Sequence, residues 1–406
     1  MAGKIFVIGI SGIGFSALGA MAEARLRESE AILASGRLYE VFSGYPCFDG
    51  LKGKLKVIDR IEDTVSYIRE AADAGVSVLA SGDPLFFGIG RVLLEEFPPE
   101  MVEIHPAVSS VQLAFARVKK TWEDALFISL HGKKLRKWEA RDLPLLLCTH
   151  EKIAVLTGGE NTPSKIAAFL PENAIVHVLE RLGYADEKMT TAAPSDIVNM
   201  EFGEPNLMVV EDKNKKTGQA ITGLKEEEFL HERGLITKDE VRAIVLHKLR
   251  LPVQGVFWDI GAGSGSISIE AKRLSPGLKV YAIEKDLARA NDISVNAEKL
   301  CAGAVNVITG GAPDMLAGLP APQRVFIGGS GGMLEELIEA AARVMEGGII
   351  VVAAITIESL SGAAGAFKKQ GFKYDICQVS VARAEPVSGR DCMKAQNPVF
   401  ILRAVI

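Results

Sequence analysis

The chain has 406 residues, 48% of them hydrophobic, which is enough for two or three domains with their own cores. A net charge of -5 argues against nucleic acid or an anionic membrane as the main partner. No apolar stretch approaches the ~20 residues of a membrane-spanning helix, and no export signal precedes the first expected strand at 4–10. We therefore expect a folded, soluble protein.

The cysteines are scattered and form no C-x-x-C pair. They are Cys47, Cys148, Cys301, Cys377 and Cys392. Neither a disulfide framework nor a zinc site is indicated, so we expect a reducing cytoplasm and no bound metal.

Strand-like runs alternate with helical patterns through the first half of the chain. The runs are 4–10, 76–81, 126–130, 153–157, 175–179 and 206–211. They predict an α/β domain over 1–212. Near its start, Gly12, Gly14 and Ala17 satisfy a degenerate dinucleotide pattern. The next strand candidate, 31–34, ends without an acidic residue for a ribose, so a tight turn explains the pattern equally well.

A polar, lysine-rich stretch at 211–218 predicts a linker over about 212–224 and a second domain over 225–406. After it, the run 237–240 fits a capping box for a helix whose apolar positions include Val241, Val245 and Leu249.

Residues 253–332 carry the clearest pattern, a strand, a glycine-rich turn, a helix and a second strand. The apolar run 255–260 suits a buried parallel strand, and the glycines of 261–265 let the backbone pass close under a ligand. Glu284 ends the second strand, 25 residues after Asp259. A carboxylate there can accept hydrogen bonds from both ribose hydroxyls. This order predicts a Rossmann-like pocket for an adenosyl group.

The spacing of the glycines distinguishes between two kinds of adenosyl ligand. A G-x-G-x-x-G dinucleotide fingerprint needs glycine where this chain has Ser266. The G-x-G-x-G spacing with an acidic end to the second strand resembles the class I S-adenosylmethionine (SAM) methyltransferases. A nucleotide fold that uses NAD, or binds no ligand, is the alternative.

The first half carries a second resemblance. The run 80–90, with Gly82-Asp83-Pro84 at its centre, closely resembles the signature loop of the tetrapyrrole methylases. Further stretches of the corrin-ring branch follow in order, at 106–110, 129–133, 156–161 and 180–184. The second half matches the partner domain of a fused subgroup of that branch at 237–242, 259–266, 311–313, 326–332 and 397–399. One departure is Gly9-Ile10-Ser11, where the family has G-x-G.

The resemblance implies a tetrapyrrole methylase fold followed by a Rossmann-like class I SAM methyltransferase fold, each with a SAM site. By motif position the first site comprises Ser81, Gly82, Asp83, Phe86, Ser109, Ser110, Thr157 and Gly183. The second comprises Thr237, Gly261, Gly263, Ser264, Gly265, Glu284 and Ala312. Asp83 can face the cationic end of SAM, although Asp83-Pro84 also suits the start of a turn.

Candidate substrate contacts come from a glycine loop and two arginines. The run 328–332 also matches a hydrolase nucleophile elbow, but His247 is the last histidine, so the later histidine of a triad is missing. We interpret Gly329, Ser330 and Gly331 as backbone N–H donors for a carboxylate. Arg383 and Arg390 are candidates for pairing with carboxylates or are solvated surface charges. His131 is a structural group or touches a ligand.

The resemblance further implies methylation of a corrin precursor at C5 and C15, with loss of an acetate carboxyl, in cobalamin biosynthesis. In the family the first half methylates C5 and the second half methylates C15 and decarboxylates. Alignment of the ring carbon with the methyl group is the main requirement, so no catalytic acid or base is singled out. The substrate is a precorrin or cobalt-precorrin, and we expect a homo-oligomer. A tetrapyrrole carrier or regulator with degenerate SAM pockets, or a methyltransferase acting twice on another substrate, is the alternative.

Overall fold

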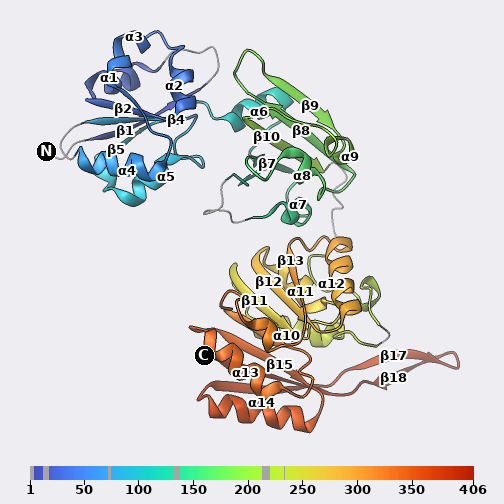
Figure 1. The fold of residues 1–406 in the computed structure, drawn as a ribbon. Coiled ribbons are helices and arrows are strands. Elements are labelled where there is room, and N and C mark those ends of the chain that lie inside the picture. Colours follow the sequence, from blue (N-terminus) through green and yellow to red (C-terminus); the bar gives the residue numbers. More distant parts are fainter. Residues whose placement is uncertain (1–3, 12–17, 72–74, 132–137, 213–219, 233) are drawn as a thin grey trace. The chain divides into compact units, whose positions relative to one another are not determined.

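The computed structural model describes residues 4–11, 18–71, 75–131, 138–212, 220–232 and 234–406 (Figure 1). The chain divides into two compact units. The first contains residues 1–136 and 150–214, and the second contains 137–149 and 215–406.

The first unit contains a parallel sheet. Within the described residues its strand order is β3-β2-β4-β1-β5. The strands are β1 (Ile5–Ile10), β2 (Ala31–Ala34), β3 (Leu55–Val57), β4 (Val76–Ser81) and β5 (Val102–His105). The central strand β1 is buried along its whole length, as expected for a strand with neighbours on both sides.

A mixed sheet completes this unit, in the order β6-β7-β10-β8-β9 as far as the chain is described. Its strands are β6 (Leu126–Ser129), β7 (Lys152–Leu156), β8 (Ala174–Glu180), β9 (Lys188–Ala192) and β10 (Asn206–Asp212). β6 and β7 run parallel, and the other neighbours pair antiparallel.

The helices of the first unit flank these sheets. They are α1 (Ala20–Glu28), α2 (Gly36–Phe42), α3 (Phe48–Leu51), α4 (Ile61–Glu70), α5 (Ile89–Glu96), α6 (Ser110–Val118), α8 (Pro163–Ala167) and α9 (Pro194–Ile197).

The second unit is built on one sheet, ordered β13-β12-β11-β14-β15-β19-β16 in the described chain. Its strands are β11 (Gln254–Ile260), β12 (Gly277–Glu284), β13 (Val305–Thr309), β14 (Arg324–Ile327), β15 (Ile349–Ala354), β16 (Lys373–Val379) and β19 (Val399–Val405). β11 to β15 are parallel, and β19 lies antiparallel between β15 and β16.

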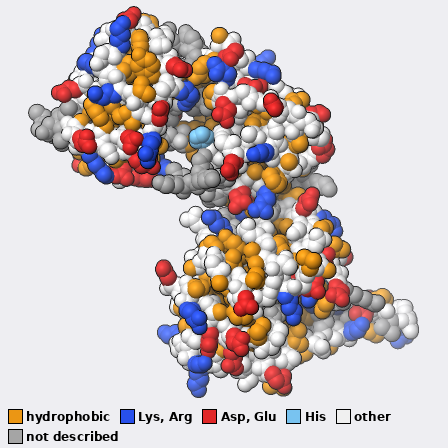
Figure 2. All heavy atoms as spheres, in the orientation of Figure 1, with side chains coloured by type: hydrophobic (Ala, Val, Ile, Leu, Met, Phe, Trp, Pro, Cys, Tyr) orange, Lys and Arg blue, Asp and Glu red, His pale blue; other side chains and the backbone are white. Residues whose placement is uncertain are grey.

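The helices of the second unit are α7 (Leu143–Leu147), α10 (Asp239–Leu249), α11 (Ser266–Leu274), α12 (Leu287–Lys299), α13 (Leu334–Val344) and α14 (Ile357–Lys369). Strands β17 (Ala382–Val387) and β18 (Arg390–Ala395) form a hairpin that projects away from the sheet (Figure 1). In the described chain, no helix is long and apolar enough to cross a membrane. On the face drawn in Figure 2, basic and acidic side chains are intermixed.

The predicted α/β folds are confirmed, and each strand-like run of the first half coincides with an observed strand. The Gly12, Gly14 and Ala17 pattern lies outside the described residues. The helix after Lys238 is confirmed, but its capping box is wrong. The helix begins at Asp239, so its N-cap is Lys238, whose ammonium group cannot accept a hydrogen bond from the backbone. The Glu240 carboxylate is bound by Arg383 at 2.6 Å instead.

The placement of 137–149 differs from the expected division at 212. Asp142 of this segment accepts a hydrogen bond from the Ala304 N–H at 2.9 Å and pairs with Lys272 at 2.9 Å. Asp142 and Lys272 are both nearly inaccessible to solvent, so the segment is an integral part of the second unit. The boundaries 1–212 and 225–406 stay a prediction about independent folding.

Candidate functional site

The glycine-rich turn after β11 passes against the loop that follows β14. Gly261 has φ +71°, and a Cβ there would lie 2.4 Å from the carbonyl oxygen of Gly329. Any larger residue would force the two loops apart. This contact places the predicted cofactor loop beside the predicted substrate loop, at the carboxyl ends of adjacent parallel strands.

Glu284 lies at the end of β12 and is 4% exposed. Its carboxylate accepts hydrogen bonds from the Gly263 N–H at 2.9 Å and the Asp286 N–H at 3.0 Å. Each oxygen retains a further lone pair, which is what two ribose hydroxyls require. Backbone N–H groups from the turn after β11 and from the segment after β12 therefore hold this carboxylate in place for a ligand.

Beneath the turn, Asp259 is fully buried. Its Oδ2 accepts hydrogen bonds from the N–H and hydroxyl of Ser268, at 3.0 and 2.6 Å, near the start of α11. Burial raises the pKa of Asp259 from 3.8 to about 7, although the Ser268 hydrogen bonds favour the charged form. The side chain ties β11 to α11 and does not line the cavity.

A cavity of about 840 Å³ opens at this edge of the sheet, within the ~300–1,000 Å³ of typical small-molecule sites. Most of the residues predicted for the second half line it. They are Thr237, Gly261, Gly263, Ser264, Glu284, Ala312, Gly329, Ser330 and Gly331. Gly265, the N-cap of α11, does not line it. A Cβ on Gly265 would lie 2.8 Å from the side chain of Ile293 in α12.

Two features of this cavity suit SAM. The Ser264 hydroxyl is buried and makes no hydrogen bond within the described chain, so a ligand can supply its partner. A Cβ on Gly263 would meet no atom within 4 Å, which means that open space lies directly above this backbone. Together with Glu284, these residues fit an adenosyl ligand with a polar tail.

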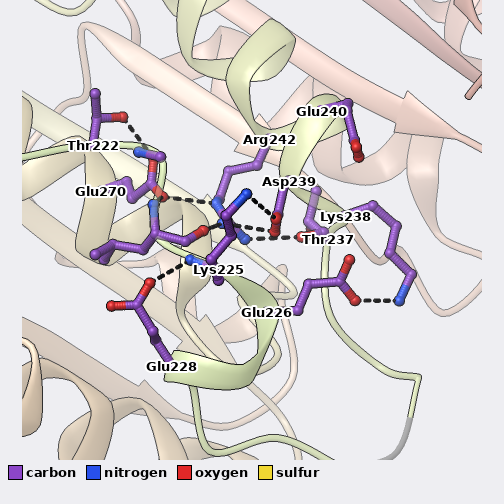
Figure 3. A network of polar contacts seen from close by, with 12 residues as sticks. Thr222, Lys225, Glu226, Glu228, Thr237, Lys238, Asp239, Glu240, Arg242 and Glu270 are labelled. Atoms are coloured by element: carbon purple, nitrogen blue, oxygen red, sulfur yellow. Dashed lines mark hydrogen bonds and ion pairs between the residues drawn. The ribbon is translucent and has the colours of Figure 1, made fainter. Parts of the chain in front are cut away.

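A polar network fixes the cavity wall formed by 234–238 (Figure 3). Arg242 and Glu270 are both buried and pair at 3.0 Å. Arg242 also donates to the carbonyls of Thr237, at 3.0 Å, and Leu224. Glu270 accepts from the Thr222 hydroxyl at 2.8 Å and the Leu224 N–H at 2.9 Å. The network therefore joins the wall to helix α11.

The two arginines proposed for substrate carboxylates do not line the cavity. Arg383 pairs with Glu226 at 2.7 Å and with Glu240 at 2.6 Å. Hydrogen bonds from Arg383 lower the pKa of Glu240. Arg390 is exposed on the hairpin. Arg383 thus joins the hairpin to the 226–240 segment, and its interaction with a ligand carboxylate stays a prediction.

In the first unit, two smaller cavities of about 280 and 230 Å³ lie beside the Gly-Asp-Pro loop. Predicted residues lining one or both are Ser81, Gly82, Asp83, Phe86, Ser109, Ser110 and Thr157, and His131 also lines the second. Gly82 has φ +62°, and a Cβ there would lie 2.9 Å from the Ser109 Cα. The loop and the start of α6 are therefore in close contact.

Several of these side chains already have local partners. Asp83 accepts from the Leu85 N–H at 2.9 Å, as the turn interpretation predicted. Ser109 caps α6, and the Thr157 hydroxyl donates to the Asn206 carbonyl at 2.6 Å. Gly183 does not line either cavity, and its N–H donates to Glu187 at 2.8 Å.

The sequence reasoning missed two cationic residues. Arg37, on α2, lines both cavities of the first unit, and Lys285, directly after Glu284, lines the cavity of the second. The position directly after the carboxylate predicted to bind a ribose was a usable signal for Lys285. No local pattern marked Arg37.

Comparison with known proteins gives two family matches. Residues 4–197 match the tetrapyrrole (corrin/porphyrin) methylases, and residues 227–405 match a precorrin methyltransferase domain.

Among relatives, a precorrin-6Y C(5,15)-methyltransferase [decarboxylating] from Sinorhizobium sp is 31% identical over 97% of this chain and 94% of its own. A protein from Pyrobaculum calidifontis, named a probable cobalt-precorrin-6B C(15)-methyltransferase (decarboxylating), is 41% identical over 46% of this chain and 96% of its own. A crystal structure of a precorrin-6Y C5,15-methyltransferase from Geobacter metallireducens GS-15 is 41% identical, covers 45% of this chain and 96% of that one, and has a TM-score of 0.44.

The first of these relatives covers both halves of the chain nearly end to end, and the two family matches fall on the two units that carry the cavities. This family uses SAM as its methyl donor. The chain therefore belongs to the precorrin-6Y C5,15-methyltransferase (decarboxylating) family.

Proposed function

We propose that this protein methylates a precorrin at C5 and C15 and removes the carboxyl group of an acetate side chain, as a step in cobalamin biosynthesis. The observation that carries the proposal is that each unit has its own cavity region lined by the residues predicted for a SAM site. A carrier or regulator with degenerate pockets would not need an intact Glu284 with both oxygens held by backbone N–H groups.

The residues assigned to SAM in the second half are Thr237, Gly261, Gly263, Ser264, Glu284 and Ala312. In the first half they are Ser81, Gly82, Asp83, Phe86, Ser109, Ser110 and Thr157. When bound, SAM supplies an electrophilic methyl group on a good leaving group. The work of the protein is to align the ring carbon with that methyl group and to exclude water. Glu284 would hold the ribose, and the loop at 329–331 would orient a carboxylate of the ring.

We assign C5 methylation to the first half, and C15 methylation with decarboxylation to the second. In support, the Pyrobaculum calidifontis relative spans less than half of this chain and carries a name for C(15) methylation and decarboxylation alone. The conjugated ring can take up the electrons that carbon dioxide leaves behind, so a dedicated acid or base in the protein is not required.

The test is incubation of the full chain with methyl-labelled SAM and a precorrin-6-type ring, with and without cobalt. Two labelled methyl groups per ring and one equivalent of carbon dioxide are expected. Tight binding of SAM without label in any ring, together with retention of the unmodified ring, would instead favour the carrier. Light scattering tests the expected homo-oligomer, and cell fractionation tests the expected cytoplasmic location.

A further inference from the structure

At the rim of the large cavity, the residue after β12 reaches the loop after β14. The Nζ of Lys285 lies 3.6 Å from the position that a Cβ would take on Gly331. Both residues line the cavity. The ammonium group is therefore placed beside the glycine loop, across the mouth of the site.

Lys285 differs from the other cations around this cavity. Three of the four lysine and arginine side chains among its described lining residues are in ion pairs: Lys238 with Glu226 at 2.6 Å, Lys394 with Glu385 at 3.0 Å, and Arg289 with Glu284 at 3.5 Å. Lys285 makes no ion pair or side-chain hydrogen bond with any residue in the described ranges. Lys285 therefore offers a ligand a positive charge that makes no direct ion pair within the described residues.

The loop beside it offers backbone donors. The N–H groups of Gly329, Ser330, Gly331 and Gly332 donate no hydrogen bond within the described part of the chain. Gly331 and Gly332 have φ +57° and +92°, and turns with such residues point successive N–H groups into a shared concavity that suits an anion. The loop is mostly exposed, so these donors are available.

We propose that Lys285 and the N–H groups of residues 329–332 form a binding site for a ligand carboxylate. The inference rests on the proposed function, which brings two carboxylates to this cavity: an acid arm of the ring and the methionine end of SAM. An ammonium and a row of amides provide charge-assisted hydrogen bonds to either one. Lys285 acts in binding, with no role in the chemical step.

The test compares Lys285→Met with Lys279→Met in the full chain. Lys279 is an exposed residue of β12, the strand that ends directly before Lys285, and it lies outside the cavity lining, so the control removes the same charge elsewhere. Three quantities are measured: KM for a precorrin-6-type ring at saturating SAM, and calorimetric Kd values for S-adenosylhomocysteine and for 5′-methylthioadenosine, which lacks the carboxylate. Loss of one charge-assisted hydrogen bond predicts a change of about tenfold.

A ring carboxylate at this site predicts a higher KM for the ring in Lys285→Met and an unchanged affinity for S-adenosylhomocysteine. The methionine carboxylate predicts weaker S-adenosylhomocysteine binding and unchanged methylthioadenosine binding. In both cases the difference between Lys285→Met and the wild type shrinks as ionic strength rises. Lys285→Arg keeps the positive charge and should retain most of the wild-type affinity.

Two results overturn the proposal. One is no difference from Lys279→Met in any of the three quantities, and the other is equal weakening of both adenosyl ligands, which reports general damage to the pocket. A wild-type protein that binds S-adenosylhomocysteine but never methylates the ring would contradict the proposed function instead, and the two adenosyl ligands would still test the site.

Discussion

The two halves of the chain carry candidate sites for the same cofactor, built in different ways. The second unit has one cavity of about 840 Å³ at the carboxyl ends of parallel strands, where Glu284 is held by backbone N–H groups. The first unit has cavities of about 280 and 230 Å³, and the side chains of Asp83 and Ser109 there are engaged in a local turn and a helix cap. A preformed carboxylate thus characterises one site, and closely packed loop backbone the other.

The largest expected effect comes from blocking one site at a time. Gly263→Asp places a side chain and a negative charge in the open space above that backbone, near Glu284, and should abolish C15 methylation and carbon dioxide release. Gly82→Val with Asp83→Ala forces the Gly-Asp-Pro loop against Ser109 and should abolish C5 methylation. Mass spectrometry of the products counts the methyl groups and the lost carboxyl.

Each of the two variants contains its own control, because its unchanged half should still act on a suitable ring. If carbon dioxide release survives Gly263→Asp and disappears with the changes at 82 and 83, the assignment of the two reactions is reversed. The proposal of two methyl-transfer sites would then stand, but not the assignment of each reaction to its half.

A smaller effect, on SAM binding, is expected when the carboxylate of Glu284 is removed. The proposal predicts close to two equivalents of SAM by titration calorimetry, one for each half. Glu284→Ala should weaken one equivalent by tenfold or more, because up to two charge-assisted hydrogen bonds of about 1.5–3 kcal/mol each are lost. Glu284→Gln is the matched variant, since it keeps the shape and one acceptor. An isotherm in which both equivalents weaken together would show that the halves are not independent.

The sequence predicted the second site in more physical detail than the first. Buried strands, glycine spacing and an acidic strand end follow from residue types and their intervals, and the structure brings most of those residues together. In the first half, the Gly-Asp-Pro loop had no such derivation, and the resemblance alone pointed to it. There the local interpretation of Asp83 as a turn residue was also correct.

Long-range polar partners were beyond the sequence patterns. Glu240 reads locally as part of a capping box, yet Arg383, more than a hundred residues later, binds it. The pairing of Asp142 with Lys272 is another long-range contact that no local pattern predicted. It ties the segment 137–149 to the second unit. Local periodicity describes elements, and such pairings depend on where the elements meet in space.

A substitution at Asp142 tests whether the two units differ in their free energy of unfolding. Asp142→Asn removes the charge that neutralises buried Lys272 and should lower the free energy of unfolding of the second unit by about 1–3 kcal/mol. Differential scanning calorimetry of the full chain should show one transition moved and the other unchanged. Asp212→Asn, an aspartate in the first unit, is a charge-matched control.

The pairing of Asp142 with Lys272 also affects what we expect when the chain is cut in the predicted linker. A cut within 212–224 should leave two folded fragments, but the fragment 225–406 lacks Asp142 and should be less stable than the same unit in the full chain. Circular dichroism melts of the fragment and of the full chain measure this. An unfolded fragment on either side would contradict the predicted two-domain division.

The last prediction concerns Asp259 and the pH dependence of the stability of the second unit. This carboxyl lies beneath the glycine turn of the second unit, and burial raises its pKa to about 7 from 3.8. Since the folded state holds the proton more tightly, the contribution of Asp259 to stability is fully present below about pH 4 and is lost as pH rises through 7. Asp259→Asn keeps an acceptor for Ser268 and cannot ionise. The difference in free energy of unfolding between this variant and the wild type should therefore shift in favour of the variant from pH 4.5 to 8, in the transition of the second unit. A constant difference across that range would show that Asp259 stays ionised in the fold.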